Sequence, residues 1–193
     1  MTIKTEHTDT KGLIQIGNST GLSLGGATAV DGAMTITGPI YPGAGGLMQA
    51  TPVVLAADNA TTNLTYAANG GRTNIIPPVA GNSKVYTLPT PAAAGEYYHF
   101  ISGNKTADNN VIHIKTTSTD GSVHFNGAIL QHDTDQTGAT SIVIFANGSS
   151  NDVLQMDDLE ACDLHFLSAS TTDWYVWGWI SSVHDAATAF GDS

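Results

Sequence analysis

Ser23 lies at the centre of the motif that most directly suggests catalysis. The segment Gly21-Leu22-Ser23-Leu24-Gly25 matches the G-x-S-x-G pattern of a nucleophile elbow. That elbow requires a strand followed by a helix, because the turn exposes the serine and nearby backbone amides stabilise the oxyanion. The residues that follow are small and Gly-rich and predict no helix of useful length. We therefore assign Ser23 no chemical role and expect the chain to have no catalytic residues and not to be an enzyme.

Two groups of acidic residues suggest cation binding or acid–base chemistry. Asp133-x-Asp135-x-x-Gly138 is similar to the start of a helix–loop–helix calcium loop, but Ile144 stands at the twelfth position, where a bidentate glutamate is required. Two interpretations of this segment stay open: an ordinary acidic turn or a looser surface calcium site. The second group has no substrate-binding pattern beside it and is interpreted as a solvated loop. It comprises Asp157, Asp158, Glu160 and Asp163.

The chain has seven histidines, which raises the question of a metal site. Neither His-x-His nor His-Glu-x-x-His occurs. Four histidines lie in predicted strands beside apolar residues, and we expect them on a polar face or at an interface: His99, His113, His124 and His165. The alternative is a metal on a symmetry axis, with one histidine from each subunit. We predict no resident metal and no cofactor.

Short strands are the elements expected to position these residues. The 193 residues are 41% apolar and only 12% charged, and Thr, Ser, Asn and Gly are abundant. This composition favours strands joined by polar turns over amphipathic helices. The length suggests one domain, or one domain with an extended arm.

The charge and the cysteine content exclude several classes of function. Six basic residues stand against 17 acidic ones, which gives a net charge of −11. Such a chain repels nucleic acid and anionic membranes, so neither is an expected partner. No apolar run approaches the roughly 20 residues that span a bilayer, and the N-terminus lacks the apolar stretch of a signal peptide. The single cysteine, Cys162, excludes an intrachain disulfide and is expected to be buried or partly buried.

Residues 1–50 are predicted to form an extended N-terminal arm. They are Gly-rich and contain short apolar segments that cannot build a core alone. The arm is either a disordered tail or a segment that becomes ordered by adding strands to a neighbouring subunit. In the second case the residues that contact the partner are Leu13, Ile14, Ile16, Leu22, Leu24, Met34 and Ile36.

Residues 51–193 are predicted to form a β-sandwich. Asn-Gly and Asp-Gly pairs, Asn126-Gly127 among them, supply turns with positive φ. The one helix expected is short and covers 157–162. The predicted strands are 52–56, 84–88, 97–102, 110–116, 122–126, 140–146, 152–156, 163–169 and 173–181.

The last of these strands is apolar on both of its faces. One face carries Trp174, Val176 and Ile180, which we expect in the core. The other carries Tyr175, Trp177 and Trp179. A strand with one buried face alternates apolar and polar residues. The second face therefore needs a cover, either a neighbouring subunit or a loop or arm of the same chain.

Several passages together resemble the capsid decoration, or cement, proteins of tailed bacteriophages, which have a jelly-roll-like body. Residues 83–101 contain Thr-Leu-Pro, a run of small residues, Gly and an aromatic strand. Residues 172–178 are similar to a W-x-V-x-G ending, and 187–190 to a Thr-Pro-Phe-type tail in which Ala189 stands in place of the proline. Residues 32–38 look like a strand module of phage structural proteins.

The resemblance implies a jelly-roll-like antiparallel β-sandwich that forms homotrimers on the outer surface of a virion. The expected function is to bridge and stabilise major capsid proteins after assembly in the bacterial cytoplasm. The trimer interface would then contain Tyr175, Trp177 and Trp179, and the arm would bind the capsid. The alternative is a tail-fibre or receptor-binding β-module, although the chain lacks a repetitive or coiled-coil shaft.

Overall fold

The computed structural model describes most of the chain after residue 50 and two short strands before it. The described residues are 4–8, 12–16, 51–57, 60–79, 83–103, 110–117, 122–134, 140–182 and 189–192. The chain divides into two compact units, Met1–Leu47 and Met48–Ser193. In the first unit, β1 (Lys4–Thr8) and β2 (Gly12–Ile16) pair antiparallel.

Three of the predicted arm residues, Leu13, Ile14 and Ile16, belong to β2. The other arm predictions and the G-x-S-x-G motif lie outside the described residues, as does the strand module at 32–38. They are Leu22, Ser23, Leu24, Met34 and Ile36.

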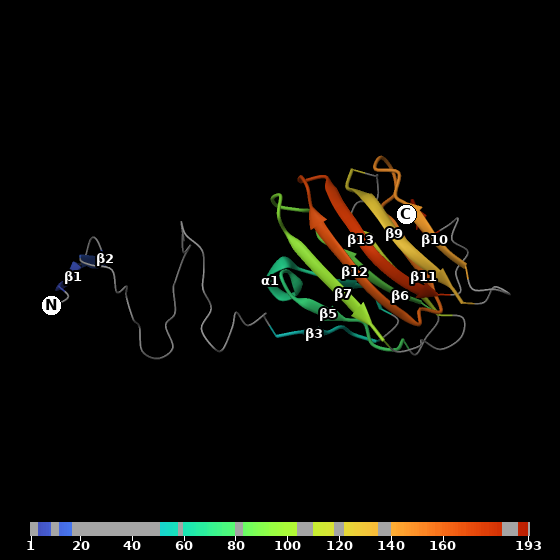
Figure 1. Cartoon of the computed structure of the whole chain (residues 1–193), viewed down its shortest axis with the longest axis horizontal. Helices are drawn as coiled ribbons and strands as arrows, with labels where there is room; N and C mark the ends of the chain where they lie inside the picture. Colours follow the sequence, from blue (N-terminus) through green and yellow to red (C-terminus); the bar gives the residue numbers. More distant parts are fainter. Residues whose placement is uncertain are drawn as a thin grey trace. The chain divides into compact units, whose positions relative to one another are not determined.

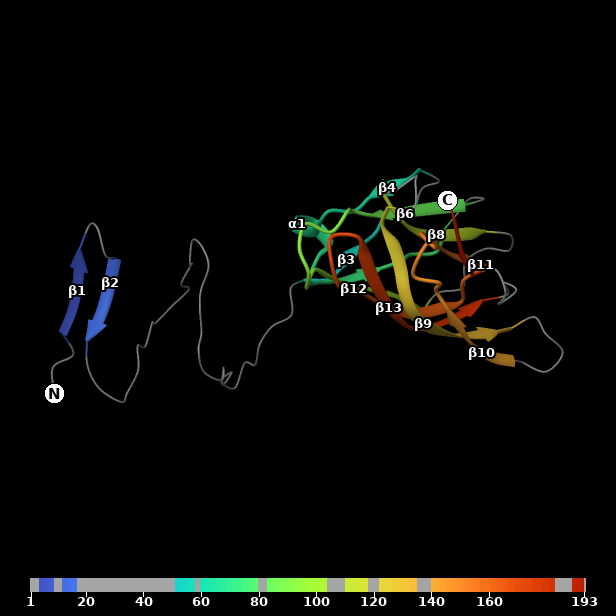
Figure 2. The same cartoon turned by 90° about the horizontal axis from the view of Figure 1, so that it is seen from above.

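The second unit is a sandwich of two β-sheets with one short helix. Figure 1 looks onto the larger sheet, and Figure 2 shows the smaller sheet as a second layer behind it. The seven-stranded sheet has the order β10-β9-β13-β12-β7-β5-β3, and the five-stranded sheet the order β14-β11-β8-β6-β4. The elements are β3 (Val53–Val54), β4 (Thr62–Asn63), α1 (Tyr66–Asn69), β5 (Thr73–Ile75), β6 (Ser83–Leu88), β7 (Tyr97–Ser102), β8 (Val111–Thr116), β9 (His124–Asp133), β10 (Thr140–Phe145), β11 (Val153–Asp157), β12 (Ala161–Ser168), β13 (Asp173–Ser182) and β14 (Phe190–Gly191).

The predicted all-β sandwich is confirmed, but its strands are not antiparallel throughout. Strand β12 pairs antiparallel with both β7 and β13, whereas β13 pairs parallel with β9 and β6 pairs parallel with β8. Side chains alternate with a period of two in either direction, so the apolar pattern could not reveal strand polarity. Jelly-roll connectivity remains a prediction.

The two sheets share one aromatic core. Phe100 and Phe166 meet edge to face with ring centroids 5.6 Å apart, and Tyr98 meets Trp174 in the same way at 5.5 Å. All four are fully buried. The predicted core face of the last strand is confirmed, because Trp174, Val176 and Ile180 belong to this core. Such rings each bury a large apolar area and dominate the stability of the sandwich.

Cys162 is buried in the same core, as expected. Burial raises the pKa of its thiol to about 12, because a thiolate is poorly solvated in an apolar environment. The thiol is therefore protonated and unreactive at neutral pH.

The helix predicted at 157–162 is wrong. Strand β11 ends at Asp157, the chain turns at Asp158 with φ of 46°, and β12 begins at Ala161. Asp tolerates this left-handed conformation better than most residues, so the segment closes a turn between two strands. The helix instead covers Tyr66–Asn69 and is capped by the Thr65 side chain, which accepts a hydrogen bond from the backbone N–H of Ala68.

Within the described residues, the chain contains no helix with the length and apolar character needed to cross a membrane.

The turn predicted at Asn126-Gly127 is also wrong, because β9 continues through it to Asp133. Gly127 has φ of 105° and Gly178 of β13 has φ of 129°. A Cβ atom at Gly127 would overlap the carbonyl oxygen of Val176, and one at Gly178 would overlap that of Asp163. These two glycines therefore let β9, β13 and β12 approach closely.

We predict that Gly178→Ala lowers the free energy of unfolding by about 2–3 kcal/mol, because it adds backbone strain and a clash with a neighbouring strand. Gly103→Ala is the matched control, since a Cβ there meets no atom within 4 Å, and its effect should stay within about 0.5 kcal/mol. Urea unfolding measures both variants. Equal loss of stability in the two would contradict this role for Gly178.

Candidate functional site

The face of the seven-stranded sheet that points away from the core is the candidate functional surface, which we call the outward face. Strand register places its side chains in rows that cross several strands. One row runs from Phe145 through Ala128, Trp177 and His165 to His99. The next row runs from Val143 through Leu130, Trp179 and Asp163 to Ile101.

The outward face exposes large apolar side chains to an unusual degree. Tyr175, Trp177 and Trp179 are 51%, 42% and 41% exposed, and Phe145 is 72% exposed. Contiguous apolar patches of this kind on soluble proteins usually mark a binding surface. The sequence predicted that this apolar face of β13 needs a cover. In the described part of the chain, its three aromatic residues are exposed accordingly. Leu130, Val143 and Leu167 extend the same surface.

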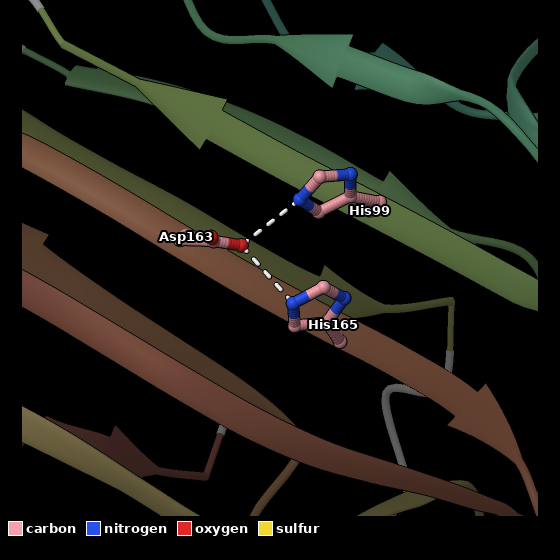
Figure 3. Close-up of side chains that lie close together, drawn as sticks. All are labelled: His99, Asp163 and His165. Carbon is pink, nitrogen blue, oxygen red and sulfur yellow. Dashed lines mark hydrogen bonds and ion pairs between the residues drawn. The ribbon is translucent and has the colours of Figure 1, made fainter.

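A compact polar group consists of His99, Asp163 and His165 (Figure 3). It lies beside the aromatic residues, because His165 stacks on Trp177. We call it the His–Asp–His cluster. The Nε2 atom of His99 lies 2.9 Å from Oδ1 of Asp163, and Nε2 of His165 lies 3.0 Å from the same oxygen. His99 of β7 is directly opposite His165 of β12, and Asp163 is two residues before His165 on the same face. The register of two neighbouring strands therefore brings the three side chains together.

A hydroxyl group forms a hydrogen bond with the Nδ1 atom of each ring. Thr73 Oγ1 lies 3.1 Å from Nδ1 of His99, and the Tyr97 hydroxyl lies 2.6 Å from Nδ1 of His165. A hydroxyl both donates and accepts hydrogen bonds, so each partner suits either tautomer of its histidine. All four ring nitrogens thus have a polar partner among the described residues.

The rings of the cluster form a stack that continues into the aromatic surface. The His99 and His165 rings are parallel within 2°, with centroids 4.5 Å apart. On its other side, His165 stacks on Trp177 with centroids 5.1 Å apart. The Tyr97 ring also stacks on His165, so the position of His165 is fixed by three ring contacts and two polar contacts.

Burial and charge both act on the protonation of the cluster. Burial lowers the pKa of His165 below its ordinary value, and the neighbouring His99 lowers it further, while the Asp163 carboxylate raises it. Burial, followed by the charge of Asp163, raises the pKa of Tyr97. At neutral pH the Tyr97 phenol is protonated and His165 is mainly neutral.

The acidic group predicted at 157–163 does not act as one loop. Asp158 accepts a hydrogen bond from the backbone of Asn110, and Glu160 accepts one from Ser181. Asp163 is separate from them, on the outward face of β12. Sequence reasoning missed its pairing with the histidines, although the pattern Asp163-x-His165 in a strand places both on one face.

The structure does not bring the remaining candidates to the cluster. His113 lies on β8 of the other sheet, and His124 begins β9. Asp133 is a buried residue at the end of β9, whereas Asp135 and Gly138 of the suggested calcium loop lie outside the described residues.

A shallow hollow of about 320 Å³ lies on the smaller sheet. His113, Lys115 and Gln155 contribute to its wall. Within the described residues, only the His–Asp–His cluster has the spacing of a ligand set for a metal ion, so this hollow does not compete with it as a candidate metal site.

Comparison with protein families, with curated proteins and with solved structures finds no match for this chain. The interpretation of the outward face therefore depends on its own geometry and on the sequence resemblance described above.

We predict that two substitutions shift the pKa of His165 in opposite directions. Asp163→Asn removes a negative charge that favours the protonated ring, so the pKa should fall further. His99→Ala removes a neighbour that disfavours protonation of His165, so the pKa of His165 should rise. NMR titration of the full chain in the presence of a chelator follows the ring directly. Shifts of the same sign would show that the contacts of the cluster do not control His165.

Proposed function

We propose that this protein is a structural virion protein, a homotrimeric decoration or cement protein with a jelly-roll-like body that bridges major capsid proteins on the outer shell. The exposed apolar outward face is the observation that supports this proposal most. Association with another protein removes such an apolar surface from water, which is energetically favourable. The resemblance to phage decoration proteins supplies the identity of the assembly.

A second copy of the chain is the proposed occupant of the outward face around β13. The chain has a net charge of −11, so two copies repel each other wherever acidic groups face each other. The two central rows of the outward face, however, carry aromatic, aliphatic and histidine side chains with Asp163 as their one acidic residue. Self-association through this part of the surface avoids the repulsion. Trp177 and Trp179 lie in these two rows and Tyr175 lies in the adjacent row. These three residues are the proposed trimer interface.

The edge of the sheet supports the same interpretation. Strand β10 is the outermost strand of the sheet in the described part of the chain, and Ile142, Val143 and Phe145 are exposed along it. An exposed apolar edge strand is a surface on which another chain can add a strand. Strand addition at β10 would extend an interface centred on β13.

The N-terminal unit is proposed to attach the trimer to the capsid. Residues 1–47 are assigned to a different unit from the body, and within that unit β1 and β2 pair antiparallel. Three linked arms bind a lattice together, so individually weak contacts add through a high effective concentration. The stabilisation of the shell would be physical, with no bond made or broken and no contact with the packaged genome.

A tail-fibre or receptor-binding module is the second candidate. Its support is that exposed Tyr and Trp rings on one sheet face can also pack against the apolar faces of sugar rings. In that case Trp177 and Trp179 would remain accessible in the assembled protein, whereas a subunit interface buries them. The two functions therefore differ in what covers β13.

We predict that the full chain raises the rupture temperature of shells assembled without it. A ligand that binds only the intact shell stabilises it by about 2.7 kcal/mol at a hundredfold excess over Kd. A chain that begins at Met48 should fold but no longer bind, because it lacks the arm. Co-sedimentation and a thermal rupture curve measure binding and stabilisation.

Ser23→Ala in the full chain is the matched control for this experiment, because it changes the arm at a residue to which we assign no chemical role. Its binding and rupture curve should equal those of the unmodified chain. Full affinity of the shortened chain would contradict attachment through the arm, and equal rupture temperatures with and without the full chain would contradict the cement function.

A further inference from the structure

We propose that His99, Asp163 and His165 bind a divalent transition-metal ion, with Zn²⁺ as the representative of the class. The inference goes beyond the cement function, because it concerns the ligand chemistry of one chain, although its three residues lie in the rows proposed for self-association. It also differs from a metal on a symmetry axis, since all three ligands come from the same chain.

The donor atoms fit this class of ion. Two imidazole nitrogens and one carboxylate oxygen suit Zn²⁺ and neighbouring divalent ions, whereas Ca²⁺ and Mg²⁺ prefer ligand sets made only of oxygen. Three protein ligands also leave at least one coordination position open. The donor set therefore favours a borderline metal that keeps a water molecule or accepts a ligand from outside.

The spacing of the donor atoms is close to what a metal requires. With bonds of about 2.1 Å, two ligands at right angles are about 3.0 Å apart and two tetrahedral ligands about 3.4 Å apart. In the cluster, the two histidine Nε2 atoms lie 2.9 and 3.0 Å from Asp163 Oδ1. All three ligand atoms lie within 4.8 Å of one another. The two Nε2 atoms therefore need to approach each other by at most about 1.4 Å to reach the tetrahedral spacing.

Binding requires the two imidazole rings to rotate. A metal ion lies near the plane of each ring that binds it, and the rings of His99 and His165 are now parallel. Both must tilt toward a common point, which is permitted because the χ2 torsion of histidine is broad. The tilt changes the contact between His165 and Trp177, so the indole of Trp177 reports on occupancy.

The hydroxyl partners support the change of tautomer that binding involves. In the tautomer with the proton on Nε2, each ring donates to the Asp163 carboxylate, and the hydroxyls of Thr73 and Tyr97 donate to the Nδ1 atoms. With a metal on Nε2, the proton moves to Nδ1, which then donates to the same hydroxyl. Partners of this kind fix the ring orientation around metal sites. Thr73 and Tyr97 are thus positioning residues that serve both states.

In the single chain the site is accessible to solvent, and it is placed on rigid elements. Asp163 has 42% of its side chain exposed, against 18% for His99 and 24% for His165. An ion can therefore reach the carboxylate from solvent, while the half-buried rings are held by β7 and β12 inside the sheet. Trp177 lies beside the site, because it stacks on His165.

The test uses the full chain without a histidine tag, stripped with a chelator that is then removed. Titration with Zn²⁺ by calorimetry should give one ion per chain. Titration with Co²⁺ should change the visible spectrum of the ion and quench tryptophan fluorescence, and the quenching should decrease in Trp177→Phe. Asp163→Asn and His165→Ala should each raise Kd at least about tenfold, and Tyr97→Phe should raise it by a smaller factor.

His132→Ala is the matched control, because His132 lies on the outward face and contacts Ser141. It should bind Zn²⁺ like the unmodified chain, and circular dichroism and urea unfolding verify that every variant is folded. Three results would overturn the proposal: no binding of Zn²⁺ or Co²⁺ to the unmodified chain, an unchanged Kd in Asp163→Asn, or an equal loss of affinity in His132→Ala.

Discussion

A two-layer β-sandwich has one interior, yet its larger sheet is apolar on both faces, and this mismatch underlies the proposed association. One face of β13 buries Trp174, Val176 and Ile180 against the smaller sheet. The same strand presents Tyr175, Trp177 and Trp179 to solvent. Burial of the first set stabilises the fold. The second set contributes favourable free energy only when another surface removes it from water.

The close approach of three strands makes the outward face possible. The backbones of β9, β13 and β12 approach at Gly127 and Gly178, where any side chain would overlap a neighbouring carbonyl group. The parallel pairing of β9 with β13 then aligns Leu130 with Trp179. Residues distant in sequence become one apolar surface, and the His–Asp–His cluster forms a polar group within it. The proposed association and the proposed metal binding therefore use the same face, and Trp177 borders both.

Local patterns revealed much of this architecture, and long-range pairing accounts for the rest. The alternation in 173–180 was sufficient to assign Trp174 to the core and Trp177 to the opposite face. The same alternation is present in parallel and antiparallel strands, so it could not predict the mixed sheets. Asn126-Gly127 has turn chemistry, but pairing on both sides of β9 overrides it. His99 is distant in sequence from Asp163, so their meeting depends on a strand register that no local signal encodes.

Sedimentation velocity of the full chain at micromolar concentration tests the central claim most directly. The account predicts a trimer that becomes a monomer when Trp177→Ser and Trp179→Ser are combined in a folded variant. Val54→Ser should leave the trimer intact, because Val54 is 67% exposed on β3 at the far edge of the sheet. An unmodified chain that sediments as a stable monomer, or a trimer that persists in the double variant, would contradict association through the outward face.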